Sequence, residues 1–119
     1  MAAHPIIHIE FSSKDHLASG KFYSELFGWE VTQVPEMNYA TFTTGEGVGG
    51  GFNPVSDQYP AGRVMAYVAT DDVPATLAKA ESLGGKTIVP KTEIPGVGWF
   101  GMFSDLSGNL VGILTPFME

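Results

Sequence analysis

Apolar and polar positions alternate over residues 7–12, with isoleucine and phenylalanine on one face and His8 and Glu10 on the other. This period of two is typical of a strand with one face in a hydrophobic core. On such a strand the His8 and Glu10 side chains point the same way, about 7 Å apart. An imidazole beside a carboxylate is unusual for a plain solvent face, so we expect this face to line a cavity.

The rest of the chain predicts a helix and three strands, followed by the same series again. Ser13 is the expected N-cap of a helix over about 14–27, which ends at Gly28. Asp71 or Asp72 is the expected cap of the second helix, over about 73–83. The other predicted strands cover 29–34, 39–44, 48–53, 63–70, 86–90 with an extension towards 93, 98–104 and 110–115.

The two series are copies of one βαβββ unit. Gly28 and Gly85 are 57 positions apart, and so are His8 and Met65 in the two opening strands. We expect a single domain over 1–119, with one unit at about 5–54, a linker at 55–62 and the second unit at about 63–116. One sheet with a helix on one face leaves its other face open. The sequence therefore predicts an α+β fold in which the two units pair into a partly closed mixed-sheet cup, with the helices outside.

Amino-acid composition argues against several classes of function. The 119 residues are 44% apolar and carry a net charge of −7, which gives no electrostatic basis for binding nucleic acid or an anionic membrane. The chain has no cysteine, which excludes disulfides, thiolate metal sites and a cysteine nucleophile. No signal peptide or transmembrane run is recognisable, and we expect a cytoplasmic protein.

Several motifs resemble the vicinal oxygen chelate superfamily, which includes glyoxalase I, bleomycin-resistance proteins and extradiol dioxygenases. The similar stretches span nearly the whole chain: His-Ile-Glu-Phe at 8–11, Phe-Tyr-Ser-Glu-Leu-Phe-Gly-Trp-Glu-Val at 22–31, Ala-Glu-Ser-Leu-Gly-Gly-Lys at 80–86 and Phe-Ser-Asp-Leu-Ser-Gly-Asn-Leu-Val-Gly at 103–112. The resemblance implies the paired βαβββ fold. It is less specific for function, because this fold carries metal enzymes and metal-free binders alike.

The resemblance also implies where metal ligands would lie. The family's first-strand ligand falls on His8, and its counterpart in the second unit falls on Met65. The acids of the last strands fall on Gly50 or Gly51 and on Gly112. One imidazole does not hold a divalent ion, which needs three or four protein donors. We therefore expect no cofactor, and a metal site completed by other residues stays an alternative.

The function expected is that of a glyoxalase-like protein which binds a small, partly aromatic or apolar molecule. The cavity residues expected for it are His8, Glu10, Phe42, Phe52, Met65, Tyr67, Trp99 and Leu114. For the aromatic residues, packing in the core is the competing interpretation. An enzyme stays open as the alternative: a lyase, isomerase or dioxygenase that uses His8 and Glu10 as catalytic acid and base, or an incomplete metal site. By resemblance we expect a homodimer.

Overall fold

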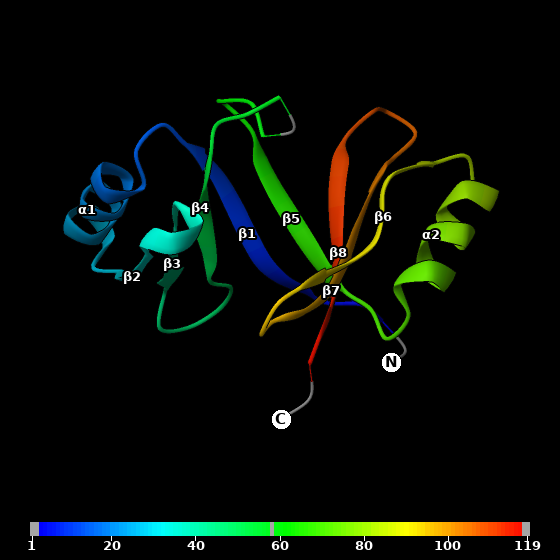
Figure 1. Cartoon of the computed structure of the whole chain (residues 1–119), viewed down its shortest axis with the longest axis horizontal. Coiled ribbons are helices and arrows are strands. Elements are labelled where there is room, and N and C mark those ends of the chain that lie inside the picture. Colours follow the sequence, from blue (N-terminus) through cyan, green and yellow to red (C-terminus); the bar gives the residue numbers. More distant parts are fainter. Residues whose placement is uncertain (1–2, 58, 118–119) are drawn as a thin grey trace. The chain divides into compact units, whose positions relative to one another are not determined.

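The computed structural model describes residues 3–57 and 59–117. It divides into two compact units, which are Ile7–Met65 (the N-terminal unit) and Ala66–Glu119 together with Met1–Ile6 (the C-terminal unit). Each unit has a four-stranded mixed sheet with one helix on one face (Figure 1). The α+β class and the twice-repeated order of strand, helix and three strands are therefore confirmed.

The sheet of the N-terminal unit has the strand order β2-β3-β4-β1, in which β1 runs parallel to β4 and the other pairs are antiparallel. Its elements are β1 (Ile6–Ser13), α1 (His16–Phe27), β2 (Glu30–Val34), the 3₁₀ turn η1 (Pro35–Met37), β3 (Tyr39–Thr43) and β4 (Gly50–Pro54).

The sheet of the C-terminal unit has the order β5-β8-β7-β6, and again its first strand runs parallel to its last. Its elements are β5 (Val64–Ala69), α2 (Val73–Ser82), β6 (Lys86–Ile94), β7 (Gly98–Ser104) and β8 (Leu110–Pro116). Strand β6 continues past Pro90 because the ladder shifts register between Val89 and Thr92. At such a bulge the missing N–H of proline leaves no ladder partner unsatisfied.

The start of α1 corrects one prediction. Asp15, and not Ser13, is the N-cap, and its carboxylate accepts hydrogen bonds from the backbone N–H groups of Leu17 and Ala18. The Ser13 hydroxyl instead accepts from the N–H of Asp15 and bonds to the Ser19 hydroxyl at 2.6 Å. Ser13 therefore stabilises the turn before the helix and does not cap it.

The same turn recurs 57 positions later, before α2. Asp72 caps the helix through the N–H of Ala75. The Thr70 hydroxyl accepts from the N–H of Asp72 and bonds to the Thr76 hydroxyl at 2.7 Å. The repeat is thus exact in residue spacing from the first strand of each unit into its helix.

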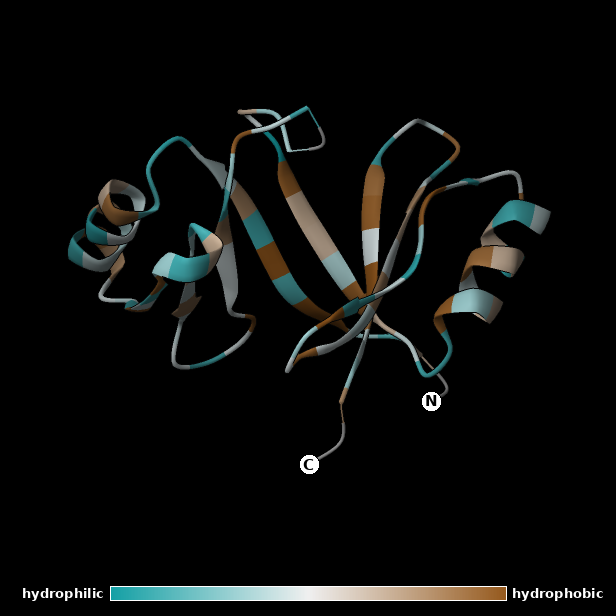
Figure 2. Ribbon diagram, in the orientation of Figure 1, coloured by the Kyte–Doolittle hydropathy of each residue, from teal (hydrophilic) through white to brown (hydrophobic). Residues whose placement is uncertain are grey.

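Stacked aromatic rings fill the space between α1 and its sheet. Tyr23 on α1 stacks on Phe11, Phe52 and Trp29, with ring centroids between 5.3 and 5.4 Å apart. Phe42 joins this group and is almost fully buried, as is Phe52. Figure 2 shows the alternation of hydrophobic and hydrophilic residues along β1 that directs Phe11 into this core.

The core beneath α2 is built from smaller side chains. Val73 and Leu77 on the helix pack against Ile113 on β8, with Val68, Trp99 and Phe103 around them. Because Trp99 and Phe103 join this cluster, their side of β7 is the one that faces α2.

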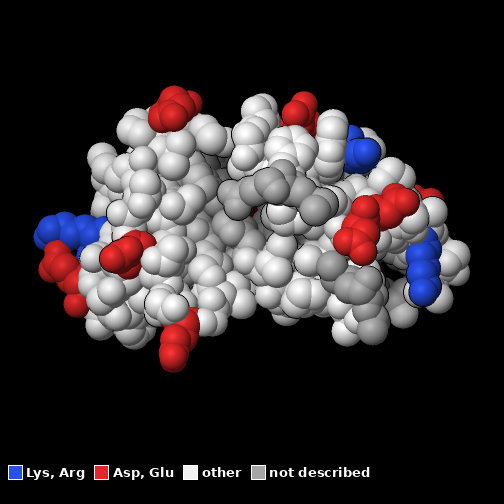
Figure 3. All heavy atoms as spheres, turned by 90° about the horizontal axis from the view of Figure 1, so that it is seen from below, with Lys and Arg blue, Asp and Glu red and all other residues white. Residues whose placement is uncertain are grey.

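Acidic residues outnumber basic ones, and Figure 3 shows carboxylates scattered over one face, with basic side chains next to some of them. Over the described part of the chain, neither helix has the length and apolar character needed to cross a bilayer.

Candidate functional site

Glu10 is the centre of a polar cluster on the face of the N-terminal sheet that points away from α1. The residue is only 8% exposed, although a carboxylate is costly to bury without partners. Three side chains compensate for this burial, from His8, Tyr39 and Asn53. We call these four residues the polar cluster.

Each oxygen of the Glu10 carboxylate has a partner. The Tyr39 hydroxyl donates to Oε2 at 2.8 Å, and the His8 Nε2 lies 3.1 Å from the same oxygen. The Asn53 amide donates to Oε1. Hydrogen bonds to a charged acceptor are stronger than neutral ones, so this set of donors holds Glu10 in one place.

The hydrogen-bond pattern determines which nitrogen of His8 carries a proton. His8 Nε2 also lies 3.0 Å from the Tyr39 hydroxyl, whose proton is directed to Glu10. Both neighbours of Nε2 are therefore acceptors, and Nε2 must be the donor. With its side chain 26% exposed, His8 is the member of the His8–Glu10 pair that a ligand can reach.

Tyr39 stays a neutral donor. Burial raises the pKa of Tyr39, and the neighbouring Glu10 carboxylate raises it further through charge repulsion and the hydrogen bond between them. A phenol in this state does not serve as a base near neutral pH. Its contribution is to orient Glu10 and His8.

The cluster depends on a glycine between the strands that carry Tyr39 and Glu10. Gly51 on β4 pairs with Thr41 on β3 and with Glu10 on β1. A Cβ atom added to Gly51 would lie 1.7 Å from the Tyr39 hydroxyl oxygen. The tyrosine therefore reaches Glu10 through space that any other residue at position 51 would occupy.

The C-terminal unit contains a similar contact between a tyrosine and a glycine, but the tyrosine comes from a different strand, β5. Tyr67, which is 57 positions after Glu10, pairs with Gly112 on β8. A Cβ atom on Gly112 would lie 2.5 Å from two ring carbons of Tyr67. In both units, then, a tyrosine side chain lies where a side chain from the last strand would begin.

These residues do not fit the metal site that the resemblance implies. Gly51 and Gly112 offer no donor, and the space at each is taken by a tyrosine. Within residues 3–57 and 59–117, no three His, Asp or Glu side chains come together as a potential metal site. His8 and Glu10 are bonded to each other, and Met65 lies at the remaining ligand position.

The structure corrects the expected cavity lining at three aromatic positions. Phe42 and Phe52 belong to the core beneath α1, on the opposite side of the sheet from Glu10. Trp99 packs with the core beneath α2, and Lys91 Nζ lies 4.5 Å from its ring centroid. Successive side chains of a strand point to opposite faces of the sheet. Because Asn53 points towards Glu10, its neighbour Phe52 must point towards α1.

Three other residues expected to line the cavity lie on the face of the C-terminal sheet that points away from α2. Tyr67 and Leu114 are buried on the side of their sheet that faces away from α2, since Tyr67 covers Gly112 and Leu114 follows Ile113 of the helix-side core. Met65 is buried on β5 at the same parity as Tyr67.

Tyr39 and Asn53 are the site residues that the sequence did not reveal. Asn53 lies two positions after Gly51 and so shares its face of β4, a parity that was available from the sequence. Tyr39 lies two strands away from Glu10, and its contact depends on a register that one sequence does not supply.

Comparison with known proteins identifies the family. The model of the glyoxalase-like domain matches residues 8–114, nearly the whole chain. The chain belongs to this family. Through it, the chain is a member of the vicinal oxygen chelate superfamily, which confirms the resemblance.

Relatives of this glyoxalase-like chain include longer proteins. It is 28% identical over 116 residues to the anthracycline biosynthesis protein DnrV of Streptomyces peucetius, covering 83% of this chain and 42% of DnrV. It is 38% identical over 81 residues to a Mycobacterium bovis protein provisionally named glyoxylase CFP32, covering 67% of this chain and 31% of that protein. The chain thus spans less than half the length of either relative.

Solved structures share the fold. A glyoxalase/bleomycin resistance protein/dioxygenase superfamily member from Vibrio splendidus superimposes with a TM-score of 0.69 at 14% identity, covering 95% of this chain and 99% of that one. At this identity the likeness concerns the fold alone.

Proposed function

We propose that this glyoxalase-like chain binds a small organic molecule at the polar cluster, without a resident metal ion. The observation that carries the proposal is the position of the Tyr39 hydroxyl, which lies in front of Gly51 and donates to Glu10. The Tyr39 hydroxyl thus occupies the position where metal-dependent relatives would have an acidic ligand, and it belongs to a hydrogen-bonded network there. A preorganised network of this kind suits recognition of a polar group on a ligand.

His8 is the group that would meet the ligand. It is the more exposed partner of Glu10, and Glu10 and Tyr39 fix the orientation of its ring. A fixed imidazole recognises a carbonyl, hydroxyl or phenol oxygen better than a mobile one, because less conformational entropy is lost on binding. Anthracycline biosynthesis, the role named for DnrV, makes planar aromatic ketones and phenols sensible first probes.

A thermal-shift screen of aromatic ketones, quinones and phenols tests the proposal. A ligand present at 100 times its dissociation constant stabilises the folded chain by about 2.7 kcal/mol. The His8→Ala variant should lose most of this stabilisation, whereas the exposed Lys14→Ala variant should keep it. Equal stabilisation of wild type and His8→Ala would place the binding elsewhere and contradict the proposal.

The second candidate is an enzyme in which His8 and Glu10 move protons. The bond between the His8 ring and a buried carboxylate favours it, because a carboxylate partner orients and supports a catalytic imidazole. Chemical analysis of any ligand recovered after incubation separates the two candidates. Unchanged ligand supports binding, and conversion that stops in His8→Gln supports catalysis.

A further inference from the structure

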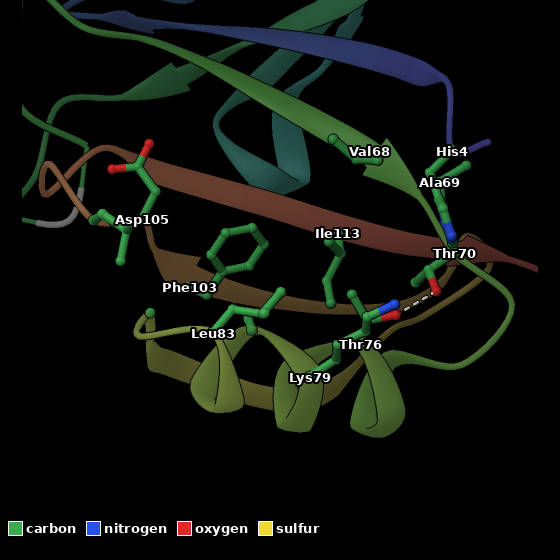
Figure 4. Close-up of a pocket in the computed structure, with 13 residues that line it drawn as sticks. His4, Val68, Ala69, Thr70, Thr76, Lys79, Leu83, Phe103, Asp105 and Ile113 are labelled. Carbon is green, nitrogen blue, oxygen red and sulfur yellow. Dashed lines mark hydrogen bonds between the residues drawn. The ribbon is translucent and has the colours of Figure 1, made fainter.

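The C-terminal unit contains a cavity of about 420 Å³ between α2 and its sheet. Its walls are largely apolar and include Val68, Phe103 and Ile113 (Figure 4). Ala80 on α2 lines it as well. This volume lies in the range of small-molecule pockets, and the cavity is open to solvent where exposed residues line it. The cavity belongs to one unit and is separate from the polar cluster.

The internal repeat explains why the cavity exists. The offset of 57 positions relates Phe11 to Val68 and Tyr23 to Ala80. Beneath α1 the rings of Phe11 and Tyr23 stack 5.4 Å apart and fill the core. Beneath α2 the equivalent residues have no ring, and both of them line the cavity.

The strand pairing shows that the neighbouring strand is also equivalent in the two units. Phe11 pairs with Phe52 on the parallel neighbouring strand, and Val68 pairs with Ile113 in the same way. Phe52 stacks on Tyr23, whereas Ile113 lines the cavity. The C-terminal unit therefore lacks three rings at the place where the N-terminal unit packs them.

The charged residues that line the cavity are expected to orient a ligand within it. The offset also relates Phe22 to Lys79, and Lys79 carries the only permanent positive charge among the described lining residues. Asp105 is at the other end of the cavity from His4 and Thr70 in Figure 4, and its carboxylate accepts from the Asn109 side chain and two backbone N–H groups. These hydrogen bonds hold the pKa of Asp105 below its usual range, so the group stays ionised and repels an anion at that end.

The mouth of the cavity is bordered by two exposed leucines. Leu83 is 69% exposed and Leu106 is 80% exposed, and both line the opening. Apolar side chains at the rim give a ring-bearing molecule a favourable path from water into the interior. The hydroxyls of Thr70 and Thr76 form a hydrogen bond with each other. They therefore contribute little to binding a polar group of the ligand.

We propose that this cavity is a second ligand site, which takes a small aromatic carboxylate. The aromatic ring lies in the space that Phe11 and Tyr23 fill in the N-terminal unit, and the carboxylate points towards Lys79. Apolar burial of the ring supplies most of the affinity, and the lysine selects the charge.

Methyl NMR with 2-naphthoate tests the site. Titration should shift the methyl resonances of Val68 and Ile113, with a dissociation constant between roughly 1 mM and 10 µM. Ala80→Tyr restores the ring found in the N-terminal unit and should weaken binding at least about tenfold, equivalent to 1.4 kcal/mol. Ala78→Tyr, on the exposed side of α2, is the matched control and should bind like wild type.

Charge selection is tested with a neutral analogue. Lys79→Met should weaken 2-naphthoate about fivefold and leave 2-naphthalenemethanol unchanged, while Lys86→Met should change neither. His8→Ala should bind 2-naphthoate normally, which distinguishes failure at this site from failure at the polar cluster. If Ala80→Tyr does not fold, Val68→Phe restores the other ring and is the second filled variant.

Three results would overturn the proposal. The first is the absence of shifts at Val68 and Ile113 at millimolar 2-naphthoate. The second is a shift pattern centred on His8 and Tyr39, which would assign the binding to the polar cluster. The third is undiminished affinity in a folded variant whose cavity is filled.

Discussion

The hydroxyl of Tyr39 occupies the space in front of Gly51, 1.7 Å from where a Cβ atom would be placed. This relationship joins three strands, because β4 carries the glycine, β3 the tyrosine and β1 the Glu10 carboxylate that the hydroxyl contacts. The absence of a side chain at position 51 is therefore what permits the polar cluster.

The first prediction concerns the coupling of these two positions. Gly51→Ala should destabilise the fold by about 1–3 kcal/mol, because the methyl group displaces Tyr39 from Glu10. In a Tyr39→Ala background the same substitution should cost less, with a coupling energy of about 1 kcal/mol or more in a double-mutant cycle. Urea unfolding of the four proteins measures it.

Gly50→Ala is the matched control for this cycle. Its Cβ would lie 1.8 Å from the backbone carbonyl oxygen of Ile9, which Tyr39→Ala does not remove. The cost at Gly50 should be the same in both backgrounds. Additive costs at Gly51 would show that Tyr39 does not limit this position.

The second prediction concerns alkaline pH. The folded chain keeps the Tyr39 proton, whose pKa is raised, while the unfolded chain releases it near the usual tyrosine pKa of about 10. Above that pH the unfolded state binds fewer protons, so stability falls by up to about 1.4 kcal/mol per pH unit from this group.

Tyr39→Phe should remove this part of the alkaline slope. Urea unfolding between about pH 9 and pH 11 gives the slope. Tyr23→Phe keeps its ring in the aromatic core and serves as the comparison. Parallel slopes for wild type and Tyr39→Phe would show that the Tyr39 proton is not retained.

The third prediction concerns the Glu10 carboxylate. Glu10→Gln replaces an acceptor oxygen with an amide that faces at least one of the donors from Tyr39, His8 or Asn53. The variant should be less stable by about 1–3 kcal/mol in chemical unfolding. Glu25→Gln, which breaks an exposed pair with Lys21 on α1, should change stability by less than about 0.5 kcal/mol. Equal effects would mean that the cluster contributes no more than a surface pair.

The fourth prediction concerns metal content. Elemental analysis of the purified protein should find zinc, nickel and iron far below one ion per chain, and His8→Ala should leave these levels unchanged. The physical reason is that His8 Nε2 is committed to Glu10 and Tyr39, and that Gly51 and Gly112 supply no donors. Stoichiometric metal that disappears in His8→Ala would contradict it.

The sequence predicted the fold well because the repeat and the alternation reinforce each other. The same offset that relates His8 to Met65 relates Asp15 to Asp72, so the N-cap of each helix lies at the same place in its unit. Sequence alone does not separate Asp15 from Ser13, because serine is an equally good cap and the offset relates Ser13 to Thr70, which can also cap a helix.

The site was predicted less completely. The pairing of His8 with Glu10 follows from their positions on one strand, whereas Tyr39 reaches Glu10 across a neighbouring strand. Phe42 and Phe52 were misplaced because aromatic residues suit a pocket and a core equally, and only the facing helix decides between them. The side of a sheet can be read from parity once one residue is fixed by a partner, as Asn53 is by Glu10.

The two glycine–tyrosine contacts also constrain how this chain can evolve. An acid at position 51 collides with Tyr39, and loss of Tyr39 beforehand takes a donor from Glu10. At position 112 an acid meets the ring of Tyr67 in the same way. An acid at either position would therefore require a second substitution at the tyrosine. Either change made alone is expected to lower the stability of the fold, so a carboxylate is not expected to arise at these positions in single steps.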